Sequence, residues 1–167
     1  MTMTDFSVAS YSRSLDTENL AALVREFADN PAAWLGGVRF VAAERWWTRL
    51  HSDDTLDVWL LTWVQDSGTD LHDHGISAGA FTVVSSRLEE VRPTGRRGAL
   101  ATTALSPGQV RRIEPSAVHD VRSPSNVPAI SIHAYSPPLR EMTFYELAAS
   151  GPVPTRTVAT AADWSPA

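Results

Sequence analysis

The feature that most constrains the fold of this chain is a series of short apolar segments separated by turn residues. The segments are rich in β-branched and aromatic residues, and a new one begins about every eight to twelve residues, which is typical of a β-sandwich or a small β-barrel. No longer internal repeat indicates a solenoid or a propeller. The pattern predicts strands at 45–51, 57–64, 70–74, 79–91, 99–104, 109–114, 118–122, 128–135 and 140–148.

An amphipathic helix is expected before the β-strands. Asp16 or Thr17 can serve as its N-cap, and Asn30-Pro31 ends it. Its apolar residues recur at positions i, i+3, i+4 and i+7, which places them on one face. They are Leu20, Leu23, Val24 and Phe27. A second short helix can begin at Pro31 and stop at the glycine pair 36–37.

The length of the chain, 167 residues, is that of a single domain. We divide it into a helical head (1–40), a β-barrel (45–148) and a C-terminal tail (151–167). The tail is rich in Ala, Thr and Pro, and we expect it to add at most one edge strand, near 155–159. The fold class expected from these patterns is mainly β, with a short N-terminal helical segment.

Composition excludes several kinds of protein. The chain has no cysteine, so it has neither disulfides nor a thiolate metal site, and any metal must be held by His, Asp or Glu. Its net charge of -5 argues against nucleic-acid binding, and no apolar run has the length of a membrane span. The polar start lacks the regions of a signal peptide, so we expect a cytoplasmic protein, and we expect a monomer.

Three histidines are candidates for a metal site. His72-Asp73-His74 is an H-x-H pair, and on a strand both imidazoles would point to the same face. His119 begins a later strand and can complete a three-histidine site, which suits iron(II) and would also accept zinc. The alternative is that these are a polar turn and an isolated core histidine. The combination favours a redox metalloenzyme.

A second group of polar residues lies on the expected strand 128–135. Ser131, His133 and Tyr135 occupy alternate positions, so they face the same way. They can form a hydrogen-bond relay from a serine hydroxyl through an imidazole to a phenol. The alternative is a barrel-lining tyrosine beside an ordinary core histidine.

Together these motifs resemble the cysteine dioxygenase family of thiol dioxygenases, within the cupin superfamily. The resemblance extends from about residue 20 to residue 140. It is carried, in order, by Asn30-Pro31-Ala32-Ala33-Trp34, Trp47-Thr48-Arg49, His72-Asp73-His74-Gly75, His119, and Ser131-Ile132-His133-Ala134-Tyr135-Ser136-Pro137-Pro138. It implies a small jelly-roll cupin β-barrel that holds non-haem iron(II), Fe(2+), and adds oxygen to the sulfur of a small thiol, giving a sulfinic acid.

The resemblance also implies roles for individual residues. His72, His74 and His119 would be the iron ligands, and the Tyr135 hydroxyl would be aimed at the oxygen and substrate by His133 and Ser131. Many cupins add a glutamate ligand shortly after the H-x-H pair, but 75–82 contains no carboxylate. Animal members carry, in place of Gly79, a cysteine joined covalently to the tyrosine, so Tyr135 is expected to be unmodified.

Substrate choice is expected to depend on Arg49. In cysteine-selective members an arginine in this place holds the substrate carboxylate, whereas 3-mercaptopropionate enzymes carry glutamine. Trp47, where cysteine dioxygenases usually have tyrosine, shares a strand face with Arg49, and Arg45 on that face is a rival for its role. We therefore expect oxidation of L-cysteine to cysteine sulfinic acid. The alternatives are another small thiol such as 3-mercaptopropionate, or a metal-binding cupin acting as a sensor, lyase or isomerase.

Overall fold

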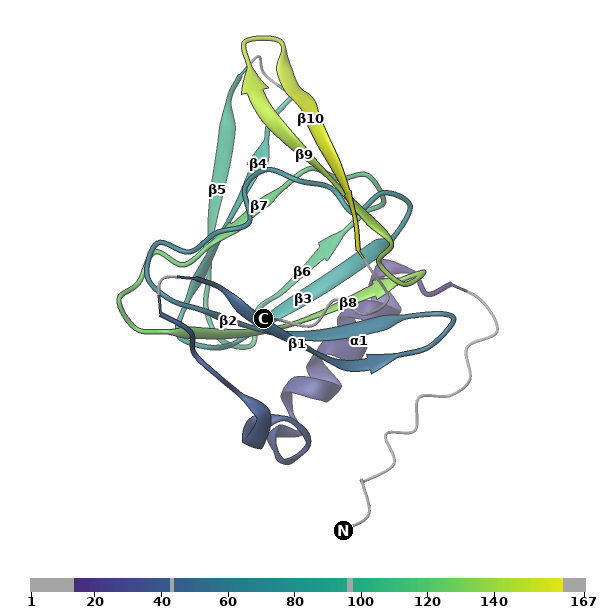
Figure 1. Cartoon of the computed structure of the whole chain (residues 1–167), viewed down its shortest axis with the longest axis vertical. Helices are drawn as coiled ribbons and strands as arrows, with labels where there is room; N and C mark the ends of the chain where they lie inside the picture. The colour runs from purple at the N-terminus through teal and green to yellow at the C-terminus, as the bar shows by residue number, and fades with distance from the viewer. Residues whose placement is uncertain (1–13, 43, 96–97, 161–167) are drawn as a thin grey trace.

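The computed structural model describes residues 14–42, 44–95 and 98–160. These residues form one α-helix, two short 3-10 helices and ten strands (Figure 1). The helices are α1 (Thr17–Ala28), η1 (Pro31–Ala33) and η2 (Leu35–Gly37). The strands are β1 (Trp46–Ser52), β2 (Asp57–Trp63), β3 (Ala78–Ser85), β4 (Leu88–Pro93), β5 (Leu100–Leu105), β6 (Val110–Ile113), β7 (Asp120–Arg122), β8 (Ala129–Ser136), β9 (Glu141–Ala148) and β10 (Gly151–Ala159).

Helix α1 covers the outer face of the largest sheet (Figure 1). The Asp16 side chain caps the helix by accepting a hydrogen bond from the Asn19 backbone N–H at 2.8 Å. Its buried face comprises Leu20, Ala21, Leu23, Val24 and Phe27. The predicted amphipathic helix is therefore confirmed. Within the described residues, no helix combines the length and the apolar character needed to cross a membrane.

The largest sheet is antiparallel, with strand order β1-β2-β8-β3-β6. Its central strand, β8, is buried along its whole length. Side chains alternate along a strand, so Ile130, Ile132 and Ala134 pack toward α1. Ser131, His133 and Tyr135 consequently point to the other face, into the barrel.

The remaining strands complete the barrel. A three-stranded sheet has the order β5-β4-β7, and β9 pairs with β10 in a hairpin that projects at the top of Figure 1. One part of the interior is filled by an apolar cluster: Trp63, Phe81, Val83, Leu88, Leu105, Ile113, Val121 and Ala129. The mainly β class with a short N-terminal helix is confirmed.

Three predicted strands differ from the observed ones. Residues 70–74 form no regular strand, because Asp70 and Gly75 adopt positive φ angles of 62° and 55° that interrupt an extended backbone. The single strand expected at 79–91 is two strands, β3 and β4, separated by Ser86 at φ 61°. The edge strand expected near 155–159 begins earlier and occupies all of β10.

Candidate metal centre

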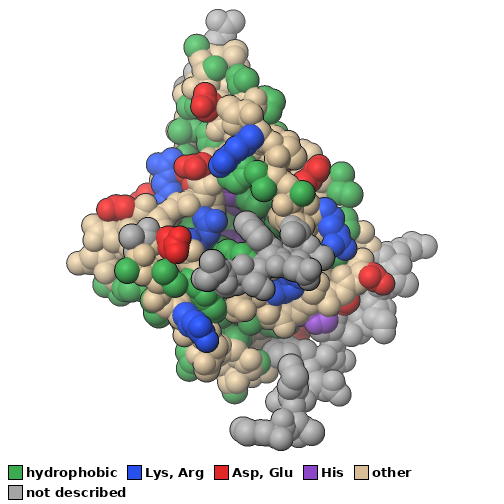
Figure 2. All heavy atoms as spheres, viewed as in Figure 1, with side chains coloured by type: hydrophobic (Ala, Val, Ile, Leu, Met, Phe, Trp, Pro, Cys, Tyr) green, Lys and Arg blue, Asp and Glu red, His purple; other side chains and the backbone are tan. Residues whose placement is uncertain are grey.

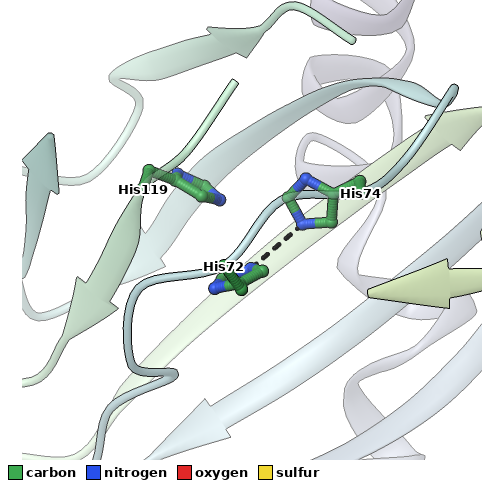
Figure 3. Close-up of side chains that lie close together, drawn as sticks. All are labelled: His72, His74 and His119. Atoms are coloured by element: carbon green, nitrogen blue, oxygen red, sulfur yellow. Dashed lines mark hydrogen bonds between the residues drawn. The ribbon is translucent and has the colours of Figure 1, made fainter. Parts of the chain in front are cut away.

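Three histidine side chains converge inside the barrel (Figure 3). His72 and His74 come from the irregular segment between β2 and β3, and His119 directly precedes β7. The backbones of His72 and His119 exchange two hydrogen bonds, at 2.8 and 2.9 Å. All three side chains are buried, and one ring nitrogen from each lies within 4.8 Å of the others. The expectation that both H-x-H histidines lie on a regular strand was wrong, but their rings still meet.

Hydrogen bonds indicate which ring nitrogens can bind a metal. The Nδ1 atom of His72 lies 2.9 Å from the Asp70 carbonyl oxygen, which only accepts, so Nδ1 carries the hydrogen and Nε2 keeps a lone pair. The Nδ1 atom of His119 lies 2.8 Å from a Glu90 carboxylate oxygen, with the same consequence. His74 Nε2 lies 3.1 Å from His72 Nε2, as the dashed line in Figure 3 shows.

This arrangement fits a metal ion. Ligand nitrogens bound at about 2.0–2.1 Å to one ion lie roughly 3 Å apart when adjacent, close to the separation of the His72 and His74 nitrogens. In the described part of the chain, His74 has no hydrogen-bond partner besides His72, and its Nδ1 is buried and unpartnered. A cation between the rings would satisfy nitrogens that otherwise face one another. The candidate ligand group found among the described residues contains no carboxylate.

Burial holds His72 and His74 in their neutral form, the form that can bind a metal. Burial, followed by the neighbouring His119, lowers the pKa of His72 to about 3. Burial and then the charges of His72 and His119 lower the pKa of His74 well below its usual value. Neutral imidazole is the form that binds a metal, so these two candidate ligands need no deprotonation at neutral pH.

Glu90 on β4 orients His119, and sequence reasoning missed it. Its side chain is fully buried and accepts hydrogen bonds from His119 Nδ1, from Arg92 at 2.8 Å and from Arg111 at 2.5 Å. Burial alone would raise the pKa of Glu90, but the hydrogen bonds from His119 and Arg92 lower it to about 2. A carboxylate behind a ligating histidine fixes the ring and makes it more basic. The only sequence signal was a glutamate inside an apolar strand.

Asp73 stabilises the irregular segment from between the two histidines. Its backbone N–H donates to the Thr143 carbonyl at 2.9 Å, and its carboxylate accepts from the Tyr145 hydroxyl at 2.6 Å and the Gly75 N–H at 3.0 Å. The hydrogen bond to Asp73 raises the pKa of Tyr145 to about 12. Strand β9 therefore holds the H-x-H segment in place through both backbone and side-chain contacts.

The Ser131, His133 and Tyr135 side chains form a chain of contacts along β8. The Ser131 hydroxyl lies 2.8 Å from His133 Nε2, and the Tyr135 hydroxyl lies 3.4 Å from His133 Nδ1. Trp63 Nε1 donates to the Ser131 hydroxyl at 2.8 Å, and the Phe81 ring stacks on the His133 ring with centroids 4.8 Å apart. Burial raises the pKa of the Tyr135 phenol, which keeps it protonated.

Gly79 allows the Tyr135 ring to approach the neighbouring strand closely. Gly79 and Tyr135 are paired across β3 and β8, and a Cβ atom at Gly79 would lie 3.0 Å from the Tyr135 ring. A larger residue here would require the ring to move. The Tyr135 ring also lies 4.6 Å, between centroids, from His74, so this close packing brings the phenol to the histidine cluster.

A cavity adjoins the histidines and the phenol. Figure 2 shows a hollow below the β9–β10 hairpin with histidine side chains visible inside it. About 90 Å³ of the cavity can be reached by the centre of a water molecule, which is room for a small molecule. Its walls are Arg45, Trp47, Trp59, Leu61, Thr69, His72, His119, Val121, His133, Tyr135, Leu139, Met142 and Phe144.

The two arginines of interest differ in their relation to this cavity. Arg45 lines it, with its guanidinium 5.3 Å from the centre of the Trp63 ring. Arg49 is not among the lining residues; its guanidinium lies 4.4 Å from the centre of the Trp59 ring, and its Nε lies 3.9 Å from Asp57. Trp47, expected beside Arg49, does line the cavity and contacts Trp59 edge to face.

Similarity to solved structures agrees with this fold. The chain is similar to an uncharacterized protein with a double-stranded β-helix domain from Klebsiella pneumoniae (16% identity, 80% of this chain and 92% of that chain, TM-score 0.53). It is also similar to a cupin superfamily protein from Desulfitobacterium hafniense (7% identity, 62% and 87% coverage, TM-score 0.52). These similarities support the cupin barrel.

Sequence comparison identifies the family. The model of the cysteine dioxygenase type I family matches residues 9–147. A curated relative, cysteine dioxygenase type 1 of Danio rerio, is 24% identical over 153 residues, covering 81% of this chain and 72% of the relative. The resemblance inferred from the histidine and tyrosine motifs is thereby confirmed, and the chain belongs to the cysteine dioxygenase type I family of thiol dioxygenases.

Proposed function

We propose that the protein holds iron(II) through His72, His74 and His119 and oxidises L-cysteine to cysteine sulfinic acid. The observation that carries this proposal is that two members of the three-histidine group, His72 and His119, line the same small cavity as Tyr135. Iron(II) bound by three neutral imidazoles supplies open coordination positions and the redox chemistry that dioxygen requires. In the overall reaction both atoms of O2 end on the substrate sulfur, so no further reductant is consumed.

Tyr135 is suited to hold a proton near the reacting sulfur and oxygen. Trp63 Nε1 can only donate to Ser131, which leaves the Ser131 hydroxyl hydrogen for His133 Nε2. Neutral His133 then carries its hydrogen on Nδ1, directed at the Tyr135 oxygen. The phenol hydrogen is thereby left for the cavity. A positioned group of this kind typically contributes about 10²-fold or more to a rate.

The walls of the cavity restrict both water and substrate size. Aromatic and apolar side chains surround the histidines on several sides: Trp47, Trp59, Leu61, Val121, Leu139, Met142 and Phe144. Excluding water strengthens the polar interactions inside and limits side reactions of oxygen. The available volume suits a thiol of a few non-hydrogen atoms.

Oxygen uptake by metal-loaded protein tests this proposal. Metal-free protein is loaded with iron(II) or, as a control, with zinc, which does not activate dioxygen. The iron-loaded protein is expected to consume O2 with L-cysteine and to form the sulfinic acid, identified by its mass with both oxygens from labelled O2. Cysteamine and 3-mercaptopropionate complete the panel. If oxygen is consumed only with another thiol, that thiol replaces cysteine as the assigned substrate. If no thiol supports oxygen uptake, the proposed oxidation is overturned.

A further inference from the structure

A second, larger pocket lies outside the cavity beside the histidines, and the two spaces share a wall. About 520 Å³ of this outer pocket can be reached by the centre of a water molecule, compared with about 90 Å³ of the cavity. The walls of the outer pocket include Arg122, Tyr145 and Arg156. Phe144 on β9 lines both spaces, so its side chain is part of the partition between them.

The backbone of β9 is fixed on both sides of Phe144. The Thr143 carbonyl accepts a hydrogen bond from the Asp73 N–H at 2.9 Å. The Tyr145 N–H donates to the Leu71 carbonyl at 2.8 Å. Movement at Phe144 is therefore a movement of the side chain, which turns between staggered rotamers while the strand stays in place.

The Phe144 ring has a different neighbour on each side of the partition. Toward the cavity it lies beside the candidate ligand His72, with ring centroids 6.0 Å apart. Toward the outer pocket the guanidinium of the exposed Arg156 lies 4.3 Å from the centre of the ring. A cation at this distance over an aromatic face is attracted to it. Arg156 therefore stabilises the ring in its position between the two spaces.

An irregularity in β10 brings Arg156 opposite Phe144. The register between β9 and β10 shifts after Pro154, which pairs with Tyr145, so that Arg156 pairs with Phe144 and Thr155 is the extra residue. The Thr155 hydroxyl donates to the Phe144 carbonyl at 3.2 Å. Residues directly opposite in a ladder share a face, and a bulge redirects a side chain in this way. Without the extra residue, the ring would have a threonine opposite it instead of a cation.

From these contacts we propose that Phe144 is a gate between the outer pocket and the cavity, and that Arg156 holds this gate in its closed position. Turning the ring into the outer pocket, where free volume is available, widens the entrance below the β9–β10 hairpin (Figure 2). A cation–π contact at an exposed position favours the closed position by only about 2- to 5-fold, which holds the ring without locking it. The gate acts on any small molecule that enters or leaves the cavity, so it does not depend on the proposed oxidation.

The binding rates of an uncharged thiol test the gate. Cobalt(II)-loaded protein, whose absorption changes when a thiolate binds the metal, is mixed with mercaptoethanol in a stopped-flow instrument without oxygen. Arg156→Gln should raise the association and dissociation rate constants together by about 2- to 5-fold and leave Kd unchanged, because a gate affects entry and exit equally. Arg156→Lys keeps the cation and should lie closer to the wild type.

Two further variants complete the rate measurements. Arg122→Gln is the matched control, because it removes a charge from the same pocket but from a side chain that binds Asp120. Its rate constants should equal those of the wild type. Phe144→Ala removes the ring itself and should accelerate both steps more than Arg156→Gln does. Unchanged rate constants in Arg156→Gln, or an equal increase in Arg122→Gln, would overturn the gate.

A chemical modification without metal separates the gate from the proposed function. Diethyl pyrocarbonate, an uncharged reagent, modifies neutral imidazole nitrogens, and mass spectrometry of the full chain without added metal gives the rate at each histidine. His51 on β1 is partly exposed and serves as the internal reference. The rate at His72 relative to His51 should rise by about 2- to 5-fold in Arg156→Gln and stay at the wild-type value in Arg122→Gln. This result would support the gate even if no thiol were oxidised, and an unchanged ratio in Arg156→Gln would overturn it while the oxidation stood.

Discussion

Two segments contribute the candidate metal ligands and the phenol beside the cavity, and they are built in different ways. Strand β8 is regular, is hydrogen-bonded to β2 and β3, and is buried throughout. The segment that carries His72 and His74 has no regular strand and is held by bonds from His119, Thr143 and Tyr145. In β8 the backbone itself directs Ser131, His133 and Tyr135, whereas the H-x-H pair depends on residues distant in sequence.

This difference predicts how each part of the site responds to amino-acid substitution. Side chains on β8 share a direction because of strand alternation, so replacing one leaves the others in place. The H-x-H segment has no such regularity, so the positions of its two candidate ligands depend on individual contacts that can be lost one at a time. We therefore expect metal binding to respond to changes outside the ligand set more readily than the β8 relay does.

The largest expected effect is a loss of metal content. It should follow replacement of a candidate ligand on the irregular segment but not replacement of a relay residue on β8. His74→Ala should reduce the metal content from about one ion per chain to a small fraction, because two imidazoles hold a metal much more weakly than three. Tyr135→Phe should keep the metal, because only the phenol hydroxyl is removed. Its turnover number should fall by about 10²-fold, because the positioned hydroxyl is lost.

Metal analysis and steady-state oxygen uptake check this contrast. Circular dichroism of both variants serves as the control for folding. Full metal occupancy in His74→Ala would remove that residue from the ligand set. Turnover of Tyr135→Phe at the wild-type rate would show that the β8 relay is a packing feature.

An intermediate effect is expected from the carboxylate that orients His119. Glu90→Gln keeps the shape of the side chain but removes the charge that faces His119, Arg92 and Arg111. Metal affinity should fall by about 10- to 100-fold, as is typical for partners of ligating histidines. A competition titration against a chelator measures it, and Glu89→Gln, the neighbouring residue on the same strand, is the matched control. Equal affinities for the two variants would contradict an orienting role for Glu90.

The smallest effect should come from the contact between β9 and the H-x-H segment. Tyr145→Phe removes the hydrogen bond to Asp73, which should lower the free energy of unfolding by about 1–2 kcal/mol. Metal affinity should fall by no more than about tenfold, because the backbone bond from Asp73 to Thr143 remains. Denaturant unfolding and the same chelator titration measure both quantities.

Thr143→Val is the control for that variant. It removes a hydroxyl from the same strand that contacts Thr157 at 3.0 Å and not the H-x-H segment. A larger loss of metal affinity in Thr143→Val than in Tyr145→Phe would show that the Asp73 contact does not position the ligands.

Much of the fold and of the candidate site could be predicted from local sequence. The helix stripe, the turn-separated strands and the family motifs indicated a mainly β cupin with an N-terminal helix, and the structure and family match confirm these points. Strand alternation predicted that Ser131, His133 and Tyr135 share a face, since a two-residue period needs no distant information. The predicted strand boundaries differ from the observed ones where single residues adopt positive φ angles, as at Asp70 and Ser86.

By itself, the sequence determined the residue types, their local spacing and the absence of cysteine, which together restrict a metal site to nitrogen and oxygen ligands. Only the tertiary structure decided that Glu90 supports His119 and that β9 secures Asp73, because these contacts join segments far apart in the chain. It also placed Arg45 in the cavity wall and Arg49 beside Asp57. Electrostatic pairing and burial depend on the three-dimensional neighbours of a charge, and a linear pattern does not specify those neighbours.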